Sequence, residues 1–193
     1  IGILLNVFKF YENNAKLDKY DGSEIVESQN PLDRWIISRL HTLIKEVRES
    51  MDRYSVHTAV KSIEKFIDDL SNWYVRRSRR RFWKEEMDRE KIEAYSTLYT
   101  VLLELSKLLA PFIPFTADYI YLSLKKDGIS VHLEDYPIPD EEKIDQELME
   151  EMEKVIRIVE AGRNARQNAG IKVRQPLPKI VVLVDDEWSK KLE

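Results

Sequence analysis

The chain has 193 residues, a formal net charge of −4 and 34% charged residues. It contains no cysteine, which excludes disulfides and thiolate metal sites, and its three histidines lack the spacing of metal ligands, so we expect no metal site. An apolar content of 43% is enough for a folded core, but no apolar run approaches the roughly 20 residues that span a bilayer. We therefore expect one large domain, or one domain plus part of another. We expect the protein to be cytoplasmic and without membrane contact.

The first part of the chain has helical periodicity. Residues 1–14 already read as helix from the first residue, so we expect the chain to be a piece of a longer protein. Asn30 and Pro31 predict the start of a second helix, as a capping residue followed by proline at the first position. Trp35 lies early in this helix and is expected in the core. Apolar residues recur along the helix at spacings of three and four: Leu32, Ile36, Leu40, Leu43, Ile44, Val47 and Met51.

Three more helices are predicted before residue 130. They run over about 59–83, 88–109 and 115–125, and Pro111 separates the last two. Because these helices are amphipathic and joined by short connections, we predict that residues 1–130 form an antiparallel helical bundle.

The remaining residues, 131–193, have a different character. A linker leads into a long helix predicted over about 140–168, which Gly170 closes. Ile180 to Val184 is β-branched or leucine throughout, which predicts a buried strand. The expected fold is thus an all-α bundle followed by a linker, a long helix and the start of a small α+β module.

Charge is distributed unevenly along the chain. Residues 134–153 carry ten acids and one base, whereas residues 157–179 carry six bases and one acid. In residues 76–84, six of nine residues are basic and none is acidic. Solvated helix faces with intrahelical pairs can account for the acidic segment, but like charges three and four apart in the arginine run repel.

A helical wheel divides the arginine run into two groups. With Ile63 as the origin and about 100° per residue, the apolar stripe continues through Tyr74 to Arg77 and Arg81. We expect these two arginines to be buried and to pair with carboxylates of neighbouring helices or of an adjoining domain. The other residues of the run are predicted to face outward: Arg76, Arg79, Arg80 and Trp83.

Outward arginines beside an indole suit RNA, because guanidinium forks grip phosphates and an indole can stack on an unpaired base. Trp73 and Trp83 bracket the run, and both are candidate RNA contacts. A merely solvated helix face is the alternative. A second basic zone could extend the phosphate track or contact the rest of the protein; it comprises Arg163, Arg166, Lys172 and Arg174.

Several segments carry a family resemblance. DLSNWYVRRSRRRFW, residues 69–83, resembles the signature helix of the anticodon-binding domain of isoleucyl-tRNA synthetases, and NPLDRWIISRL, residues 30–40, resembles the helix before it. LAPFIPFTADYIY, residues 109–121, is similar to a segment shared by the synthetases for isoleucine, valine, leucine and methionine. ARQNAGIKVRQPLP, residues 165–178, also looks like the isoleucine enzyme. The charged composition is consistent with an archaeal or thermophilic source.

The resemblance implies a module that binds the anticodon arm of tRNA(Ile) and positions this tRNA for a catalytic domain of the same parent chain. ATP and Mg²⁺ would bind in that parent enzyme, and any zinc would lie elsewhere in it. We expect no cofactor and no catalysis in this piece, because it has no phosphate-binding loop or catalytic triad. Two alternatives stay open: the same module from a valyl- or leucyl-type synthetase, and a helical protein-interaction domain with a basic face.

Overall fold

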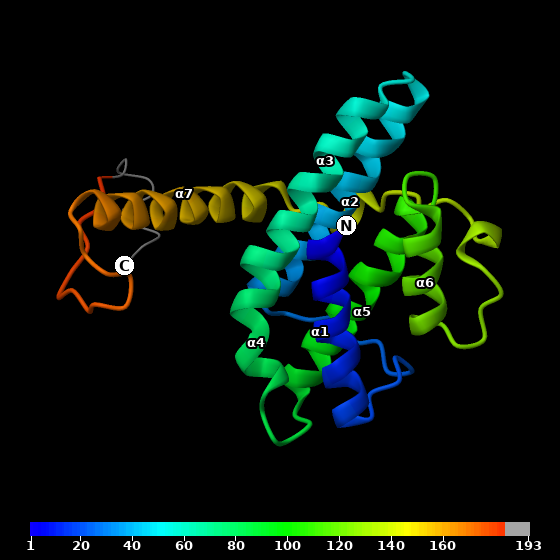
Figure 1. Ribbon diagram of the computed structural model, residues 1–193, viewed down its shortest axis with the longest axis horizontal. Helices are drawn as coiled ribbons and strands as arrows, with labels where there is room; N and C mark the ends of the chain where they lie inside the picture. Colours follow the sequence, from blue (N-terminus) through cyan, green and yellow to red (C-terminus); the bar gives the residue numbers. More distant parts are fainter. Residues whose placement is uncertain (184–193) are drawn as a thin grey trace. The chain divides into compact units, whose positions relative to one another are not determined.

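The computed structural model describes residues 1–183 (Figure 1). It divides into two compact units, Ile1–Gln146 and a second unit from Glu147 onward. Within residues 1–183 the regular structure is helical and no strand is formed, which confirms the all-α prediction. None of the helices in this part of the chain is long and apolar enough to cross a membrane.

The first unit is the predicted helical bundle. Helices α2 and α3 form a hairpin, and α5 packs on both α2 and α6 (Figure 1). Between α3 and α4 the chain continues without a break through a π-helix, η1, so that residues 56–82 form one helical rod. The elements of this unit are α1 (Gly2–Asp18), α2 (Pro31–Asp52), α3 (Val56–Asp68), η1 (Asp69–Val75), α4 (Arg76–Phe82), α5 (Arg89–Leu109), α6 (Pro114–Leu124) and the short 3-10 turns η2 (Val131–Leu133) and η3 (Glu141–Lys143).

Side-chain caps fix the starts of the two longest helices of the bundle. The Asn30 side-chain oxygen accepts the N–H of Leu32 at 2.9 Å, and Pro31 occupies the first helical position, where its missing N–H is not needed. Asp88 caps α5 in the same way by accepting the N–H of Lys91 at 2.8 Å. The five helices predicted for this region therefore begin and end within a few residues of the expected positions.

The core of the first unit is rich in large aromatic side chains, and Trp35 is 2% exposed, as predicted. Edge-to-face ring contacts bring α1, α4 and α5 together, because Phe82 lies 5.1 Å from Phe10 and 4.8 Å from Tyr95 between ring centroids. Such pairs stabilise a core beyond the area that they bury. The arginine-bearing α4 is thus held by packing on its inner side.

The predicted linker after residue 130 packs against α2. We call residues 136–145 the strap. Arg34 forms an ion pair with Asp145 at 2.7 Å, and Arg48 donates to the Pro137 carbonyl at 3.0 Å, so the strap runs antiparallel to α2. The α2 residues that hold the strap recur at alternating spacings of four and three, which places them on one face: Arg34, Ser38, His41, Lys45 and Arg48. The compact first unit therefore extends to Gln146, beyond the predicted boundary at residue 130.

The second unit contains α7 (Gln146–Asn168), which begins later than the predicted residue 140 because the strap occupies residues 140–145. Gly170 follows α7 with φ 66, as a left-handed residue after a helix end. The predicted strand is wrong over Ile180–Leu183, which are irregular; Val184 lies outside the described residues. A strand needs a hydrogen-bonded partner strand, and residues 1–183 supply none.

Candidate nucleic-acid interface

The helical rod of residues 56–82 owes its burial pattern to the π-helix in its middle. In an α-helix, a step of four residues overshoots a full turn by about 40°, so four such steps drift by about 160°. In η1 the turns are wider: the Arg76 N–H donates to the Ser71 carbonyl, five residues back. The wider turns absorb the drift, and one buried row with a constant spacing of four runs along the rod. Its members, none more than 2% exposed, are Phe66, Leu70, Tyr74, Ser78 and Phe82.

The same π-helix turns three consecutive side chains inward and the next two outward. Trp73, Tyr74 and Val75 are all buried, while Arg76 and Arg77 are exposed. The expectation that Arg77 is buried is therefore wrong. The wheel assumed a uniform α-helical rotation, whereas the wider turns of η1 shift the buried row so that Ser78 and Arg81, but not Arg77, lie on its inner side.

Trp73 does not have the position expected of a base-stacking residue. It is 7% exposed, and the guanidinium carbon of Arg77 lies 3.8 Å from the centroid of its ring system. A cation over an indole face is a favourable arrangement, and here it occupies the face that a base would need. We correct the assignment accordingly: Trp73 orients Arg77, and we remove it from the predicted RNA-contacting set.

Arg81 is buried and ion-paired, as predicted. Its two terminal nitrogens donate to the two carboxylate oxygens of Asp33 on α2, at 2.7 and 2.6 Å. One of them also donates to the Glu90 carbonyl at 3.0 Å. Burial by itself disfavours the charged guanidinium, but the Asp33 carboxylate outweighs it and raises the pKa of Arg81. The pair ties α4 to α2 and to the start of α5.

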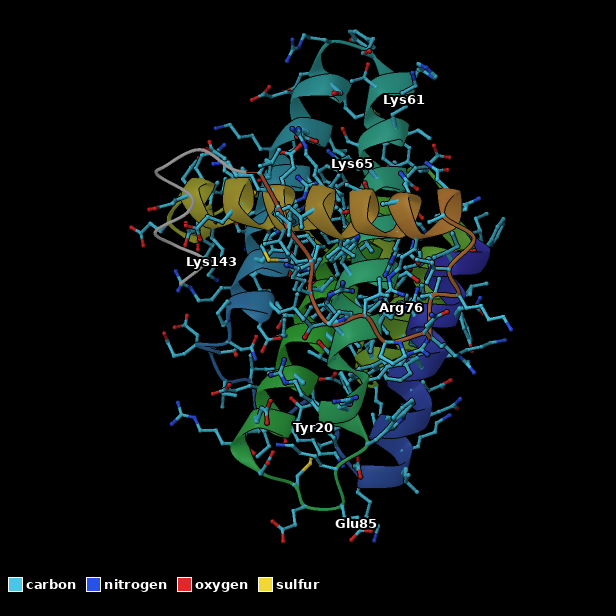
Figure 2. The ribbon with its side chains drawn as sticks, turned by 90° about the vertical axis from the view of Figure 1, so that its left-hand side faces the viewer. Tyr20, Lys61, Lys65, Arg76, Glu85 and Lys143 are labelled. Atoms are coloured by element: carbon cyan, nitrogen blue, oxygen red, sulfur yellow. The ribbon has the colours of Figure 1, made fainter. Side chains whose placement is uncertain are left out.

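The remaining arginines of α4 point away from the core with Trp83. We call Arg76, Arg77, Arg79, Arg80 and Trp83 the outer arginine face. All four arginines are exposed, and Trp83 is 61% exposed. Figure 2 shows Arg76 on the same rod as Lys61 and Lys65 of α3.

Ion pairs leave most of this face available. Among residues 1–183, no ion pair involves Arg76, Arg79 or Arg80. Lys84, the last base of the run, is already engaged by Asp88 at 2.7 Å and by Glu90, and these partners raise its pKa. The free positive charge is therefore concentrated on α4 itself.

The second basic zone belongs to the second unit. Arg163, Lys172 and Arg174 are exposed. Arg166 is half-buried, and its guanidinium donates to the carbonyls of Lys172 and Gln175 at 3.2 and 2.8 Å. Arg166 thus holds the turn that follows α7. In contrast to the other three residues, it has a structural role within its own unit.

Two features of the interface were missed from the sequence. One is Asp33, the buried partner of Arg81, whose only signal was its place in the first turn of a predicted helix. The other is η1, whose signal was the constant spacing of four from Phe66 to Tyr74. Within residues 1–183, no group of three or more histidines and carboxylates is arranged to hold a metal ion.

Comparisons with known proteins agree with this geometry. Residues 33–182 match a family model described as the anticodon-binding domain of tRNA ligase. The chain is similar to the isoleucine–tRNA ligase of Picrophilus torridus, with 48% identity over 96% of this chain. It is also similar to the isoleucine–tRNA ligase of Thermoplasma volcanium, with 43% identity over 94%, and to isoleucine–tRNA ligase 2 of Bacillus cereus, with 45% identity over 97%. In each case the chain spans 18% of the relative's length.

Proposed function

This chain belongs to the family of anticodon-binding domains of tRNA ligases, and on that premise we propose that it binds the anticodon arm of tRNA(Ile). The observation that carries the proposal is the outer arginine face, where exposed guanidinium groups and an exposed indole share one side of α4. The names of the similar ligases favour isoleucine tRNA over that of valine or leucine.

The chemistry of the face fits an anticodon loop. Bases in such a loop are unstacked, so their faces and edges can be reached, whereas the major groove of an A-form stem is too deep and narrow for side chains. Arg76, Arg79 and Arg80 would grip phosphates of the loop and stem, and Trp83 would offer a face to one base. The acidic residues of 134–153 would repel the RNA backbone.

Rigidity supports this role. The buried pair of Arg81 with Asp33 and the stacking of Arg77 on Trp73 hold α4 before any ligand binds. Less side-chain and helix freedom is then lost on binding, which favours affinity.

We further propose that the domain holds tRNA for a catalytic domain elsewhere in the same ligase, where ATP and Mg²⁺ would bind. The chain spans less than a fifth of the ligases that it resembles, which leaves ample length for that domain. On this proposal the domain itself carries out no chemistry.

Filter binding tests the proposal with the full-length ligase and three transcripts, tRNA(Ile), tRNA(Val) and tRNA(Met). We expect the tightest binding to tRNA(Ile), and weaker binding to it when Arg76, Arg79 and Arg80 are all replaced by alanine. Lys45→Ala is the matched control, because Lys45 is an exposed base that pairs with Glu141 at 2.9 Å on the strap side of α2. Binding of tRNA(Ile) by the triple variant at wild-type strength would show that the outer arginine face is only solvated.

A further inference from the structure

A second feature of the first unit has the chemistry of a nucleotide site. A cavity of about 380 Å³ lies among α1, α5 and the end of α6, within the size range of small-ligand pockets. Its lining combines aromatic rings with lysines, and the residues that the argument uses are Tyr11, Lys19, Tyr20, Tyr99, Ser123 and Lys126.

Two tyrosines of the lining present hydroxyl groups without partners. The rings of Tyr11 and Tyr99 lie 6.3 Å apart at an angle of 48°, and within residues 1–183 no hydrogen bond engages either hydroxyl. Burial raises the pKa of both, so both stay protonated and can donate as well as accept. Neither hydroxyl is sealed from solvent, so a ligand in the cavity can reach both and replace the water that otherwise bonds them.

The position of the Tyr99 ring is fixed from one side by backbone. Gly22 has φ 80, and a Cβ at this residue would lie 2.6 Å from Cε2 of Tyr99. Only glycine allows this close approach in that conformation. The wall of the cavity is therefore formed before any ligand binds.

Lysines stand at the rim of the cavity. Lys16 pairs with Glu12 at 2.8 Å. Asp21 accepts the N–H and hydroxyl of Ser23 at 3.0 and 2.6 Å, and these bonds lower the pKa of Asp21, which stays charged. Lys19 and Lys126 are exposed, and neither forms an ion pair among residues 1–183. The lining thus carries three lysines against Glu12 and Asp21, which leaves its mouth net positive. An aromatic interior with a positive mouth suits a nucleotide, which has an aromatic base and an anionic phosphate.

Helix α1 links the cavity to the outer arginine face. It contacts α4 through Phe10 and Phe82, and α6 through Phe8 and Tyr119, so it lies between them (Figure 1). The outward side of α1 between these contacts carries Lys9 and Asn13, both exposed. An RNA backbone that leaves α4 can therefore cross α1 on polar and basic side chains before it reaches the cavity.

We infer that this cavity binds one unpaired nucleotide of the same tRNA, a contact that rests on the proposed function. The base packs against the tyrosine rings and its edge bonds the hydroxyls of Tyr11 and Tyr99. The phosphate lies near Lys19 and Lys126. This nucleotide is distinct from the one that Trp83 would stack on, because α1 separates the two positions.

The test is to block the cavity in the full-length ligase and measure tRNA(Ile) affinity at several salt concentrations. Ser123→Phe places a ring in the cavity from a half-exposed lining position. Loss of one stacked base corresponds to a weakening of roughly 5- to 150-fold. Expelling the nucleotide also displaces its phosphate, so the salt slope should fall by about 0.7. Lys126→Ala should lower the slope by the same amount with a smaller loss of affinity, because the base stays stacked. The matched control is Ser62→Phe, a half-exposed serine on α3, which should bind as wild type does.

The outcomes separate the two proposals. If Ser123→Phe binds tRNA(Ile) as wild type does while the triple arginine variant is impaired, the cavity proposal fails and the proposed function stands. If the triple variant is also unaffected, both fail. Should Ser123→Phe lower the melting temperature, Tyr99→Phe decides instead, because it keeps the ring and removes only the hydroxyl. We expect Tyr99→Phe to weaken binding about 2- to 10-fold, and wild-type affinity in that variant would overturn the inference.

Discussion

The outer arginine face of α4 and the second basic zone, which covers the end of α7 and the turn after it, both carry exposed bases, yet they differ in what holds them. On α4, a buried ion pair, a cation–π contact and a core of aromatic rings fix the helix that carries the charges. In the second unit, α7 has no buried residue, and Arg166 bonds only the backbone of its own turn. Exposed positive charge alone therefore does not determine how readily a segment binds RNA. A preorganised helix can hold several guanidinium groups in register, whereas a loosely supported segment loses conformational freedom when it binds.

The largest effect is expected when the ion pair that anchors α4 to α2 is removed. Arg81→Ala leaves the carboxylate of Asp33, which is 1% exposed, buried without its partner. We expect the free energy of unfolding to fall by about 3–5 kcal/mol, the usual cost of breaking a buried pair from one side. Urea unfolding of the chain measures the change. Arg80→Ala on the exposed side is the control and should stay within about 0.5 kcal/mol of wild type. A similar small change for Arg81→Ala would show that the pair does not anchor the helix.

The next test removes the charges and keeps the support. Replacing Arg76, Arg79 and Arg80 together by alanine should lower the log–log salt slope of tRNA(Ile) binding by about 2, because each phosphate contact to a single-stranded region contributes about 0.7. The melting temperature should not change, since all three side chains are exposed. The same triple replacement of Arg163, Lys172 and Arg174 serves as the comparison. An equal loss of slope there would mean that the less supported zone contributes as much.

Trp83→Ala sharpens the distinction between stacking and charge. We expect a loss of roughly 1–3 kcal/mol in binding free energy with an unchanged salt slope, because a stacked base is held without counterion release. Binding isotherms at several salt concentrations provide both quantities. Trp73→Ala should behave differently and lower stability, since Trp73 is buried. Loss of slope in Trp83→Ala would contradict a stacking role.

The smallest effect is expected for Arg166→Ala. Both bonds are exposed, so water can replace them, and we expect their combined loss to cost about 0.5–1 kcal/mol in local stability. Amide hydrogen exchange over residues 169–175 would detect the faster local opening while exchange in the bundle stays constant. Unchanged protection in this segment would argue that the turn forms without Arg166.

The helices of the bundle could be predicted because local rules dominate there. Asn30 caps α2, and the apolar stripes have the helical period. Arg81 lies on the buried stripe, where a charged guanidinium needs an ion-pair partner, and it pairs with Asp33. The sequence also predicted the outward orientation of four residues, all of which are exposed in the structure: Arg76, Arg79, Arg80 and Trp83.

The failures share a different cause, which is dependence on contacts or geometry beyond a local window. The orientation of Arg77 and the burial of Trp73 depend on a change of helix type that a wheel with fixed rotation cannot represent. Ile180–Leu183 are irregular although their composition favours a strand, because residues 1–183 provide no partner strand. The attachment of the strap depends on polar side chains of α2 whose partners lie about a hundred residues away in the chain.

The π-helix also determines how this rod can tolerate changes in length. A π-helical turn holds one more residue than an α-helical turn, so deleting one residue within Asp69–Val75 would let the segment relax to an ordinary α-helix with little rotation of α4 relative to α3. A deletion within α3 has no such reserve, because it would rotate everything after it by about 100°, carry Arg81 off Asp33 and turn the outer arginines toward a neighbouring helix. The seven residues of η1 thus set the rotation of α4 about the rod axis relative to α3. The rod can therefore lose one residue within η1 and keep the Arg81–Asp33 pair, whereas its residue count within α3 is constrained.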